Sequence, residues 1–341
     1  MSTQPERLQL GPRETQEVLE RYDIDEVTDV TAYEQGSRRS PKAVVRTLGG
    51  TYLLKRRAPG QDDMDRIRFQ HAVQLHLEAH GCSIATLLKT KRNGNTLVRR
   101  GSRIYELFQF IDGTRFESSI AQVRASGAAM SRMHEVCMEW AGPTPSGIGY
   151  HASQDVDRGF TLIKDRIRSI ELYCRPLQDL YAEAQARVDA LGWSELPRTI
   201  VHGDWHPGNM LFRGEAMAAL LDFDSTRLEP RVSEFANGAL QFAMRFGEPI
   251  DVSLPESPHV PAIEAMRVGY DAGTFTMLEP HELAMTPWLM IEALIVEGTL
   301  PVATHGQFGH VPAPIFLQHM QRLGKWIREH ADDIIERMQR R

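Results

Sequence analysis

The strongest constraint on the fold of this chain is a short polar segment between two apolar runs. It reads His-Gly-Asp-Trp-His-Pro-Gly-Asn over residues 202–209, follows the β-branched run Thr-Ile-Val and precedes Met-Leu-Phe. A β-branched run of this kind predicts a strand that ends in a loop. The proline and glycine turn the chain, so that Asp204 and Asn209 can face one cavity. The segment therefore predicts a functional loop between two strands.

A second acidic segment follows at a short distance. Asp222 stands thirteen residues after Asn209, in the sequence Leu-Leu-Asp-Phe-Asp, and the apolar runs between them flank Arg-Gly-Glu. This pattern predicts a hairpin that returns Asp222 close to Asn209. The arrangement fits a phosphotransferase, in which one carboxylate (Asp204) orients and deprotonates an accepting hydroxyl. Asn209 and Asp222 would hold Mg²⁺ against the phosphates of a nucleotide.

The two motifs together resemble the aminoglycoside phosphotransferase and choline kinase superfamily. They are His-Gly-Asp-x-x-x-x-Asn and Leu-Asp-Phe-Asp, and the resemblance is strongest to the bacterial homoserine-kinase-like and stress-response-kinase-like branch. It implies an α+β, bilobal, protein-kinase-like fold. We expect a β-rich nucleotide-binding lobe over residues 1–110 and a mostly helical catalytic and acceptor-binding lobe over residues 111–341. The resemblance also implies catalysis by Asp204 and metal binding by Asn209 and Asp222.

Two other interpretations of the loop stay open. His202, Asp204 and His206 alternate as residues on one face of a strand do, and zinc hydrolases use such ligands. The sequence shows no second histidine-rich cluster with matching spacing. Asp204 and Asn209 are also common turn residues without any catalytic role. Asp224 either lies near the metal or caps the segment that follows.

The first third of the chain offers a lysine for the nucleotide. Residues 43–48 and 51–56 are two β-rich runs joined by Gly-Gly, which predicts a hairpin with Lys55 at the end of its second strand. Kinases keep the lysine that contacts the α- and β-phosphates at such a position. Arg56 and Arg57 are the alternatives, because a one-residue shift turns a side chain to the opposite face.

Other nucleotide contacts are indicated more weakly. Residues 33–40, which precede the predicted strand 43–48, contain one glycine and would form the loop that covers the phosphates. Segment 103–113 predicts the last strand of the lobe and a hinge whose backbone binds adenine. The candidate residues of the two segments are Gly36, Ser37 and Ser40, and then Glu106 and Phe108.

The predicted helix over residues 62–80 departs from the family pattern. Relatives usually place a glutamate there to pair with the strand lysine, but this chain has Gln70 and His71, with Glu78 a turn later. Lys55 is then held by another acid such as Asp65, or the ion pair is missing.

Length and composition agree with two lobes in a cytoplasmic protein. A chain of 341 residues exceeds the usual size of one core. Its net charge of −6 argues against a nucleic-acid partner. Three cysteines without metal spacing indicate a reducing compartment. No apolar run approaches the roughly 20 residues of a membrane span, so we expect no membrane partner.

These observations predict transfer of the γ-phosphoryl group of ATP, with Mg²⁺, to the hydroxyl of a small metabolite. An amino alcohol or an amino acid such as homoserine is the expected acceptor. The alternatives are a stress-response type Ser/Thr kinase with a protein substrate, or a nucleotide-binding regulatory pseudokinase, which the missing helix acid leaves open. We expect at least one of four acids within reach of Asp204, in a pocket closed by segment 301–314: Glu229, Glu234, Glu292 and Glu297.

Overall fold

The computed structural model describes residues 7–145, 147, 149–167, 170–244, 254–273 and 276–340. The chain forms two compact units. The N-terminal unit comprises Met1–Gly113 with Ala218–Asp224, and the C-terminal unit comprises Thr114–Met217 with Ser225–Arg341. The predicted lobe boundary at residue 110 stays a prediction. The compact units are discontinuous, because the short segment ending at Asp224 packs with the N-terminal unit.

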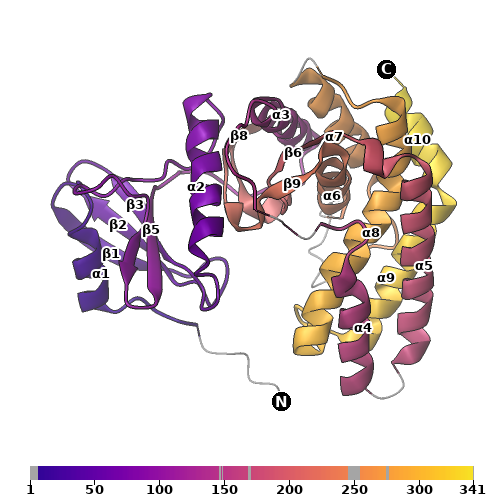
Figure 1. Ribbon diagram of the computed structural model, residues 1–341, viewed down its shortest axis with the longest axis horizontal. Helices are drawn as coiled ribbons and strands as arrows, with labels where there is room; N and C mark the ends of the chain where they lie inside the picture. The colour runs from indigo at the N-terminus through magenta and orange to yellow at the C-terminus, as the bar shows by residue number, and fades with distance from the viewer. Residues whose placement is uncertain are drawn as a thin grey trace. The chain divides into compact units, whose positions relative to one another are not determined.

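The N-terminal unit is built on a five-stranded antiparallel sheet with the strand order β1-β2-β3-β5-β4 (Figure 1). The predicted Gly-Gly hairpin joins β2 to β3, with Arg46 opposite Thr51. The strands are β1 (Val27–Tyr33), β2 (Lys42–Thr47), β3 (Thr51–Arg56), β4 (Val98–Arg100) and β5 (Arg103–Gln109).

The register of the sheet decides what each face carries. Leu54 of β3 stands opposite Leu107 of β5, and Lys55 stands opposite Glu106. Because neighbouring residues of a strand point to opposite faces, the leucines and the charged pair lie on different sides. Helix α1 (Pro12–Leu19) covers the leucine face, where Val18 packs into the buried cluster with Leu54 and Leu107.

Helix α2 (Met64–Ala79) lies on the opposite, charged face of the sheet, so that the sheet stands between α1 and α2 (Figure 1). The helix begins after Asp63, whose carboxylate accepts hydrogen bonds from the backbone N–H groups of Asp65 and Arg66 at 3.0 and 3.2 Å. It ends before Gly81, which adopts a φ of 74°. The predicted helix over residues 62–80 is confirmed to within two residues.

The C-terminal unit is mostly helical. Its helices are α3 (Ile120–Cys137), α4 (Gln154–Arg166), α5 (Glu171–Ala190), α6 (Arg231–Ala243), α7 (Val260–Ala272), α8 (Pro280–His305), α9 (Ala313–Glu329) and α10 (Ala331–Gln339). Short strands form three two-stranded sheets: β6 (Arg198–Val201) with β9 (Arg227–Pro230), β7 (Met210–Arg213) with β8 (Ala216–Leu220), and β10 (Gln307–Phe308) with β11 (Val311–Pro312). Both units together confirm the α+β class.

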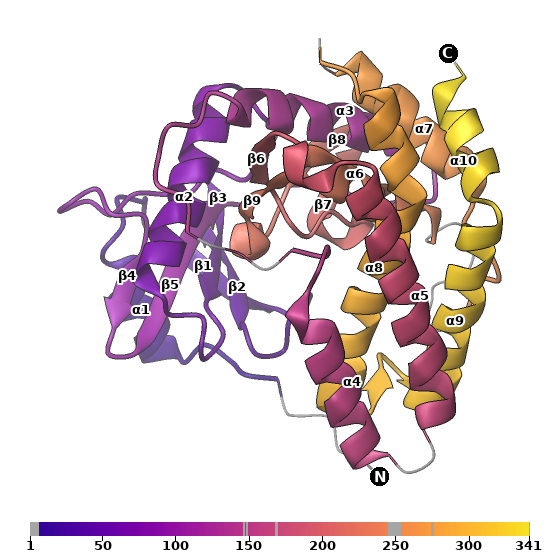
Figure 2. The ribbon, with the colours of Figure 1, turned by 45° about the vertical axis from the view of Figure 1, so that its right-hand side comes forward.

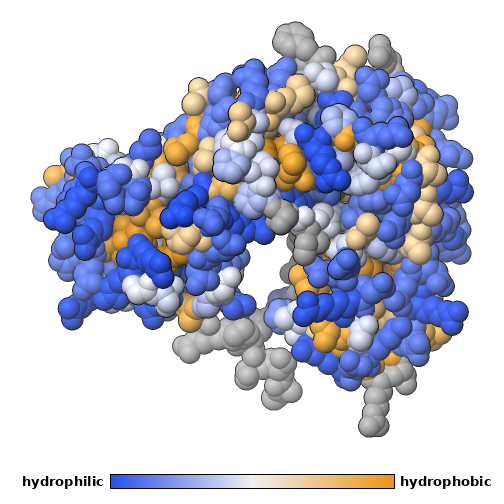
Figure 3. Space-filling model, in the orientation of Figure 1, coloured by the Kyte–Doolittle hydropathy of each residue, from blue (hydrophilic) through white to orange (hydrophobic). Residues whose placement is uncertain are grey.

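Helix α8 is the central helix of the C-terminal unit. It packs against α4, α5, α6, α9 and α10, and Figure 2 shows it beside α5 and α9. By length and composition alone it could cross a membrane, which the sequence analysis did not foresee, but 67% of its most apolar window is buried inside the protein. This burial of α8 is typical of a core helix. The face of this unit seen in Figure 3 is mainly hydrophilic.

The segment 301–314, expected to close the acceptor pocket, begins inside a helix. Helix α8 continues through Pro301 and ends at His305, before Gly306, whose φ is 72°. The proline removes one helical hydrogen bond, while the residues after it, Val302 and Ala303, are buried and hold the last turn in place.

Candidate active site

Lys55 lies in a cluster of charges on the α2 side of the sheet, within the N-terminal unit. Its Nζ is 3.1 Å from Oδ1 of Asp222 and 3.0 Å from Oδ2 of Asp224. The Lys55 side chain is only 9% exposed. Burial lowers the pKa of Lys55, but the two carboxylates outweigh it and hold the pKa above its ordinary value. The lysine is therefore charged and fixed in place.

The acids reach Lys55 because the end of β8 and the residues after it belong to the N-terminal unit. The N–H of Leu220 donates to the carbonyl oxygen of Ser83 at 2.8 Å, and Leu220 forms a parallel bridge with Ile84. The chain then turns at Asp222, which has a φ of 63°. A left-handed non-glycine residue costs on the order of 1 kcal/mol and is common at functional sites, where surrounding contacts hold it. The strain here is offset by the Lys55 ion pair.

Asp222 and Asp224 share one cation and titrate differently. Burial raises the pKa of Asp222, but the ammonium of Lys55 lowers it further, so that it stays well below the ordinary value. Burial raises the pKa of Asp224, and the negative charge of Asp222 adds to this rise. Asp222 is thus the permanent anion of the pair. This answers which acids pair with Lys55: they follow the β7–β8 hairpin and do not come from α2.

Gln70 and His71 stand on α2 where the family resemblance predicted a glutamate. Gln70 of α2 donates from Nε2 to the backbone oxygen of Asp224 at 2.7 Å. His71 lies with Nε2 2.7 Å from Oε1 of Glu106. Asp65, named as a possible partner of Lys55, instead pairs with Arg68 on the surface, so that suggestion is wrong. Helix α2 still supports the Lys55 cluster, but through Gln70.

Glu106 is the buried acid of this face. Its Oε1 accepts from Nε of Arg57 at 2.6 Å, and Nη2 of Arg57 lies 3.1 Å from Asp224. Burial raises the pKa of Glu106, but Arg57 and then the hydrogen bond with His71 lower it to about 2. The side chain predicted at the hinge is therefore already engaged by protein groups. Arg56, the other alternative to Lys55, faces α1 and pairs with Glu14 at 2.7 Å.

The other predicted nucleotide residues lie at the edge of this face. Gly36 adopts a φ of 80°, which only glycine takes without strain. Ser37 Oγ accepts from the N–H of Arg39 at 3.3 Å, and Ser40 donates to the Arg56 carbonyl at 2.8 Å. Phe108 of β5 stands opposite Leu53 on the Lys55 face. Their contacts with a nucleotide stay predictions.

Asp204 and Asn209 meet within the loop of the C-terminal unit. Strand β6 ends at Val201, and the turn over Pro207–Asn209 brings the two side chains together. Nδ2 of Asn209 donates to Oδ2 of Asp204 at 2.8 Å and to its backbone oxygen at 3.0 Å. Burial raises the pKa of Asp204, but hydrogen bonding with His206 and the charge effects around it lower it below the ordinary value. Asp204 is an ionised acceptor at neutral pH.

The loop is held at both polar atoms of Gly203. Its N–H donates to Oε1 of Glu234 at 2.6 Å, and its carbonyl oxygen accepts from Nη1 of Arg227 at 2.9 Å. His134 binds Oε2 of Glu234 at 2.8 Å. With a φ of 81°, Gly203 leaves no room for a Cβ against Arg227 and the Ser225 carbonyl. Glu234 is one of the four acids named from the sequence, whereas Arg227 was missed because no spacing links it to Gly203.

One of the four predicted acids differs from the other three. Glu229 pairs with Arg227 at 2.7 Å, and Glu292 contacts His151 at 3.0 Å. Glu234 binds Gly203 and His134, as described above. Glu297 of α8 accepts only from the phenol of Tyr150, at 2.6 Å, and among the described residues no lysine or arginine lies within ion-pair distance of it. Burial raises the pKa of Glu297, and the negative charge of Asp204 adds to the rise. The Tyr150 hydroxyl that contacts Glu297 also lies 3.4 Å from the carbonyl oxygen of Gly203, the residue before Asp204.

The donors predicted for Mg²⁺ suit that ion. Because the amide nitrogen of Asn209 faces Asp204, its carbonyl oxygen Oδ1 is turned away and accepts no recorded hydrogen bond from the described residues. Asp222 supplies an ionised carboxylate. Hard cations prefer such oxygen donors. No group of three or more His, Cys, Asp or Glu side chains with metal-binding geometry occurs in the described part of the chain. His206 Nδ1 accepts instead from the N–H of Gly208 at 2.9 Å.

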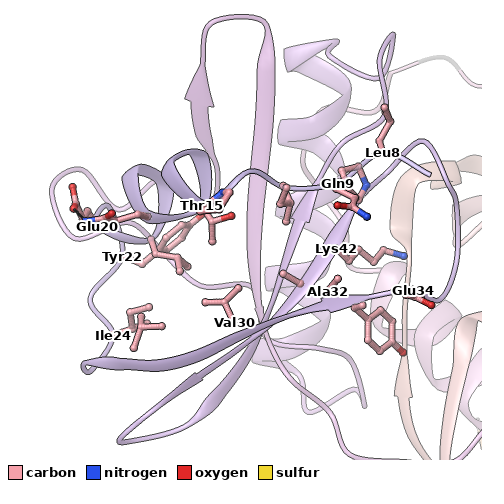
Figure 4. Close-up of a pocket in the computed structure, with 18 of the residues that line it drawn as sticks. Leu8, Gln9, Thr15, Glu20, Tyr22, Ile24, Val30, Ala32, Glu34 and Lys42 are labelled. Atoms are coloured by element: carbon pink, nitrogen blue, oxygen red, sulfur yellow. Dashed lines mark hydrogen bonds between the residues drawn. The ribbon is translucent and has the colours of Figure 1, made fainter. Parts of the chain in front are cut away.

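A further hollow of the N-terminal unit lies away from the Lys55 cluster. A cavity of about 550 Å³ separates α1 and the segment before it from strands β1 and β2. Figure 4 shows Val30, Ala32 and Ile24 along its floor. Val30 and Ala32 stand opposite Val45 and Ala43, on the α1 face of the sheet, and Lys55 does not line it. The cavity is separate from the Lys55 cluster.

Structural comparison places this architecture among known enzymes. A microcompartment-associated aminopropanol kinase has a TM-score of 0.69 at 14% identity, covering 94% of this chain and 97% of that structure. An amicoumacin kinase in complex with AMP-PNP and Ca²⁺ has a TM-score of 0.66 at 14% identity, with 94% and 93% covered. An aminoglycoside phosphotransferase from Alicyclobacillus acidocaldarius has a TM-score of 0.63 at 17% identity, with 95% and 94% covered. These likenesses confirm the protein-kinase-like fold.

Sequence comparison agrees with the fold. Homoserine kinase of Beijerinckia indica is 25% identical over 206 residues, which cover 60% of this chain and 61% of that enzyme. Homoserine kinase of Nitrobacter winogradskyi is 24% identical over 216 residues, 63% of each chain. The match thus spans less than two thirds of these relatives. The model of the phosphotransferase enzyme family matches residues 30–268, which include Lys55, Asp204 and Asp222, and the chain therefore belongs to this family.

Proposed function

We propose that this protein is an ATP- and Mg²⁺-dependent kinase. It transfers the γ-phosphoryl group of ATP to a hydroxyl of a small metabolite that carries an amino group. The observation that carries the proposal is the pairing of Asp204 with Asn209, in which the amide nitrogen holds the carboxylate and leaves the amide oxygen free for a cation. The homology to homoserine kinases supports the same chemistry.

Asp204 acts on the acceptor. Its pKa, lowered by the His206 contact, keeps the carboxylate ionised, so it accepts a hydrogen bond from the acceptor hydroxyl and takes up the proton as phosphoryl transfer proceeds. Asn209 fixes one carboxylate oxygen, Oδ2, and directs the other toward a substrate. Positioned proton transfer of this kind contributes about 10²- to 10⁴-fold in rate.

Asn209 and Asp222 are the proposed ligands of Mg²⁺. The bound ion would neutralise charge on the phosphate oxygens of the nucleotide. Asp222 is suited to this role because Lys55 keeps it ionised. Asp224 is suited to positioning, since its raised pKa makes it the weaker anion and it also contacts Arg57.

Lys55 is proposed to contact the α- and β-phosphates. Its two carboxylate partners hold the ammonium where β3 ends, and Arg57 in turn pairs with one of them, Asp224. Gly36, Ser37 and Ser40 are proposed to lie over the phosphates. Phe108 would form an apolar wall for adenine, and Glu106 would contribute through its backbone only, since its side chain is bound by Arg57.

The acceptor is proposed to present an ammonium group to Glu297. A buried carboxylate without a cation is costly, and Glu297 has only the neutral Tyr150 as hydrogen-bond partner. An ammonium group paired with Glu297 would relieve this cost, and the neighbouring hydroxyl of the acceptor would then lie near Asp204. This favours an amino alcohol or a hydroxyl-bearing amino acid over a protein side chain.

A matched panel of acceptors tests the proposal. ADP formation is measured with homoserine, with small amino alcohols, with the same alcohols lacking the amino group and with generic peptides, each with Mg²⁺ and with a chelator. We expect Mg²⁺-dependent turnover of at least one amino-bearing acceptor and much weaker turnover of its matched analogue. Phosphorylation of peptides alone would indicate a protein kinase. Nucleotide binding without any turnover would indicate a regulatory protein.

A further inference from the structure

A second lysine lies on the same face of the sheet as Lys55. Lys42, the first residue of β2, stands directly opposite Lys55 in the antiparallel register. Side chains opposite each other in such a pair share one face, about 5 Å apart at Cβ, and like charges placed there destabilise the sheet. The retention of two ammonium groups side by side therefore calls for a compensating anion.

The protein compensates one of these lysines and not the other. Lys55 has Asp222 and Asp224 at 3.1 and 3.0 Å. Lys42 interacts with these acids only at longer range, and no carboxylate of the described residues lies within ion-pair distance of it. Burial lowers the pKa of Lys42, and the charge of Lys55 lowers it further. A half-buried ammonium is left without a counter-ion.

The amino group of Lys42 is directed to the loop between β1 and β2. A Cβ built on Gly36 would lie 2.7 Å from Nζ of Lys42, so the ammonium rests against the Gly36 turn. Figure 4 shows the side chain extending toward the loop that carries Glu34 and away from Val30 and Ile24 in the cavity. The lysine is thus oriented to the loop that is proposed to cover the phosphates.

We propose that Lys42 is a second phosphate-binding lysine, which contacts the polyphosphate of the nucleotide from β2 while Lys55 contacts it from β3. A lysine is a compact point charge suited to phosphate. The role rests on the proposed function, because the anion is the nucleotide. It extends that function by naming a residue that no motif in the sequence indicates.

Calorimetric titration of the full chain with a phosphate series tests this role. The probes are adenosine, AMP, ADP and AMP-PNP with Mg²⁺, and the proteins are wild type, Lys42→Met, Lys42→Arg and Lys91→Ala. Lys42→Met keeps the aliphatic stem and removes the charge. Lys91→Ala removes an equal charge from another part of the lining of the cavity of about 550 Å³, which Lys42 also borders. Loss of one charge-assisted hydrogen bond weakens binding by about 10- to 100-fold.

We expect Lys42→Met to bind AMP-PNP about 10- to 100-fold more weakly than wild type. Adenosine affinity should be unchanged, Lys42→Arg should retain most of the affinity, and Lys91→Ala should match wild type. The phosphate at which the defect first appears in the series identifies the one that Lys42 contacts. Wild-type binding of AMP-PNP by Lys42→Met, or an equal loss for adenosine, would overturn the role alone. Absence of any nucleotide binding by the wild-type protein would remove the proposed function together with it.

Discussion

The two candidate clusters hold their carboxylates in opposite ways. In the N-terminal unit every acid of the cluster has a cation: Asp222 and Asp224 share Lys55, and Glu106 binds Arg57. In the C-terminal unit Asp204 is held by an amide and an imidazole. Glu297 is held by the phenol of Tyr150. No lysine or arginine of the described residues lies within ion-pair distance of Asp204 or Glu297.

This difference separates two tasks. Charges that are paired inside the protein are fixed in position and hold their ionisation state, which suits the recognition of a highly charged nucleotide. Carboxylates held without a lysine or an arginine keep their negative charge available to a substrate, whether they accept a proton or bind a cation. The comparison predicts that substitutions in the first cluster affect folding and nucleotide binding, while substitutions in the second affect the acceptor.

The largest expected effect is on turnover, from Asp204→Asn. The amide keeps the shape of the side chain but cannot take up the proton of the acceptor hydroxyl. We expect kcat to fall by about 10²- to 10⁴-fold. Affinity for AMP-PNP with Mg²⁺, measured by calorimetry, should stay within a few-fold of wild type. Residual turnover near the wild-type rate would show that Asp204 only shapes the loop.

The next effect is on stability, from Glu106→Gln. This change leaves Arg57 buried without its nearest anion, and removing one partner of a buried pair typically costs about 3–5 kcal/mol. Chemical denaturation should therefore show a much lower free energy of unfolding. Glu17→Gln is the matched control, because Glu17 contacts Arg13 and Arg100 only on the exposed surface. Equal stability of the two variants would contradict the importance of paired charges in this unit.

A smaller effect is expected from Glu297→Gln, and it should fall on the acceptor. Without the carboxylate, KM for an amino-bearing acceptor should rise by about 10- to 100-fold, the value of one charged hydrogen bond. KM for ATP and the free energy of unfolding should change little, since Tyr150 can still donate to the amide oxygen. A matched acceptor without the amino group should lose nothing. An equal loss for both acceptors would show that Glu297 acts only through Tyr150 on the loop.

The sequence predicted those parts of the site that are local in the chain. Asp204 and Asn209 are five residues apart, and a single turn brings them together. The Gly-Gly hairpin fixed the face of Lys55, because alternation along a strand leaves only one choice once the turn is set. The predicted fold class followed from the family resemblance that these local motifs carry.

The partners of these residues could not be predicted in the same way. Lys55 is separated from Asp222 by 167 residues and from Asp224 by 169. Its pairing depends on the backbone contact of Leu220 with Ser83. The family resemblance predicted an acid on α2, where Gln70 stands instead. The contact of Arg227 with Gly203 depends on the pairing of β6 with β9, which no local residue pattern predicts.

The smallest expected effect is a pH dependence of stability that originates away from both clusters. Burial raises the pKa of Glu292 to about 7, although the hydrogen bond with His151 opposes the rise. Burial lowers the pKa of His151, but Glu292 and Asp189 raise it above the ordinary value. Both shifts mean that the folded chain keeps protons which the unfolded chain releases. Stability from this pair is therefore complete below pH 4.5, the ordinary pKa of a glutamate, and is lost as the pH rises through about 7.

Chemical denaturation of wild type and Glu292→Gln between pH 5 and 8 measures this effect. The difference between the two proteins should change by about 1–2 kcal/mol over this range, since one pKa unit corresponds to about 1.4 kcal/mol. The wild-type curve should fall with pH, and the substitution Glu292→Gln should flatten it, since an amide does not titrate. Parallel curves would show that Glu292 ionises at its ordinary pKa and that its burial does not contribute to the pH dependence.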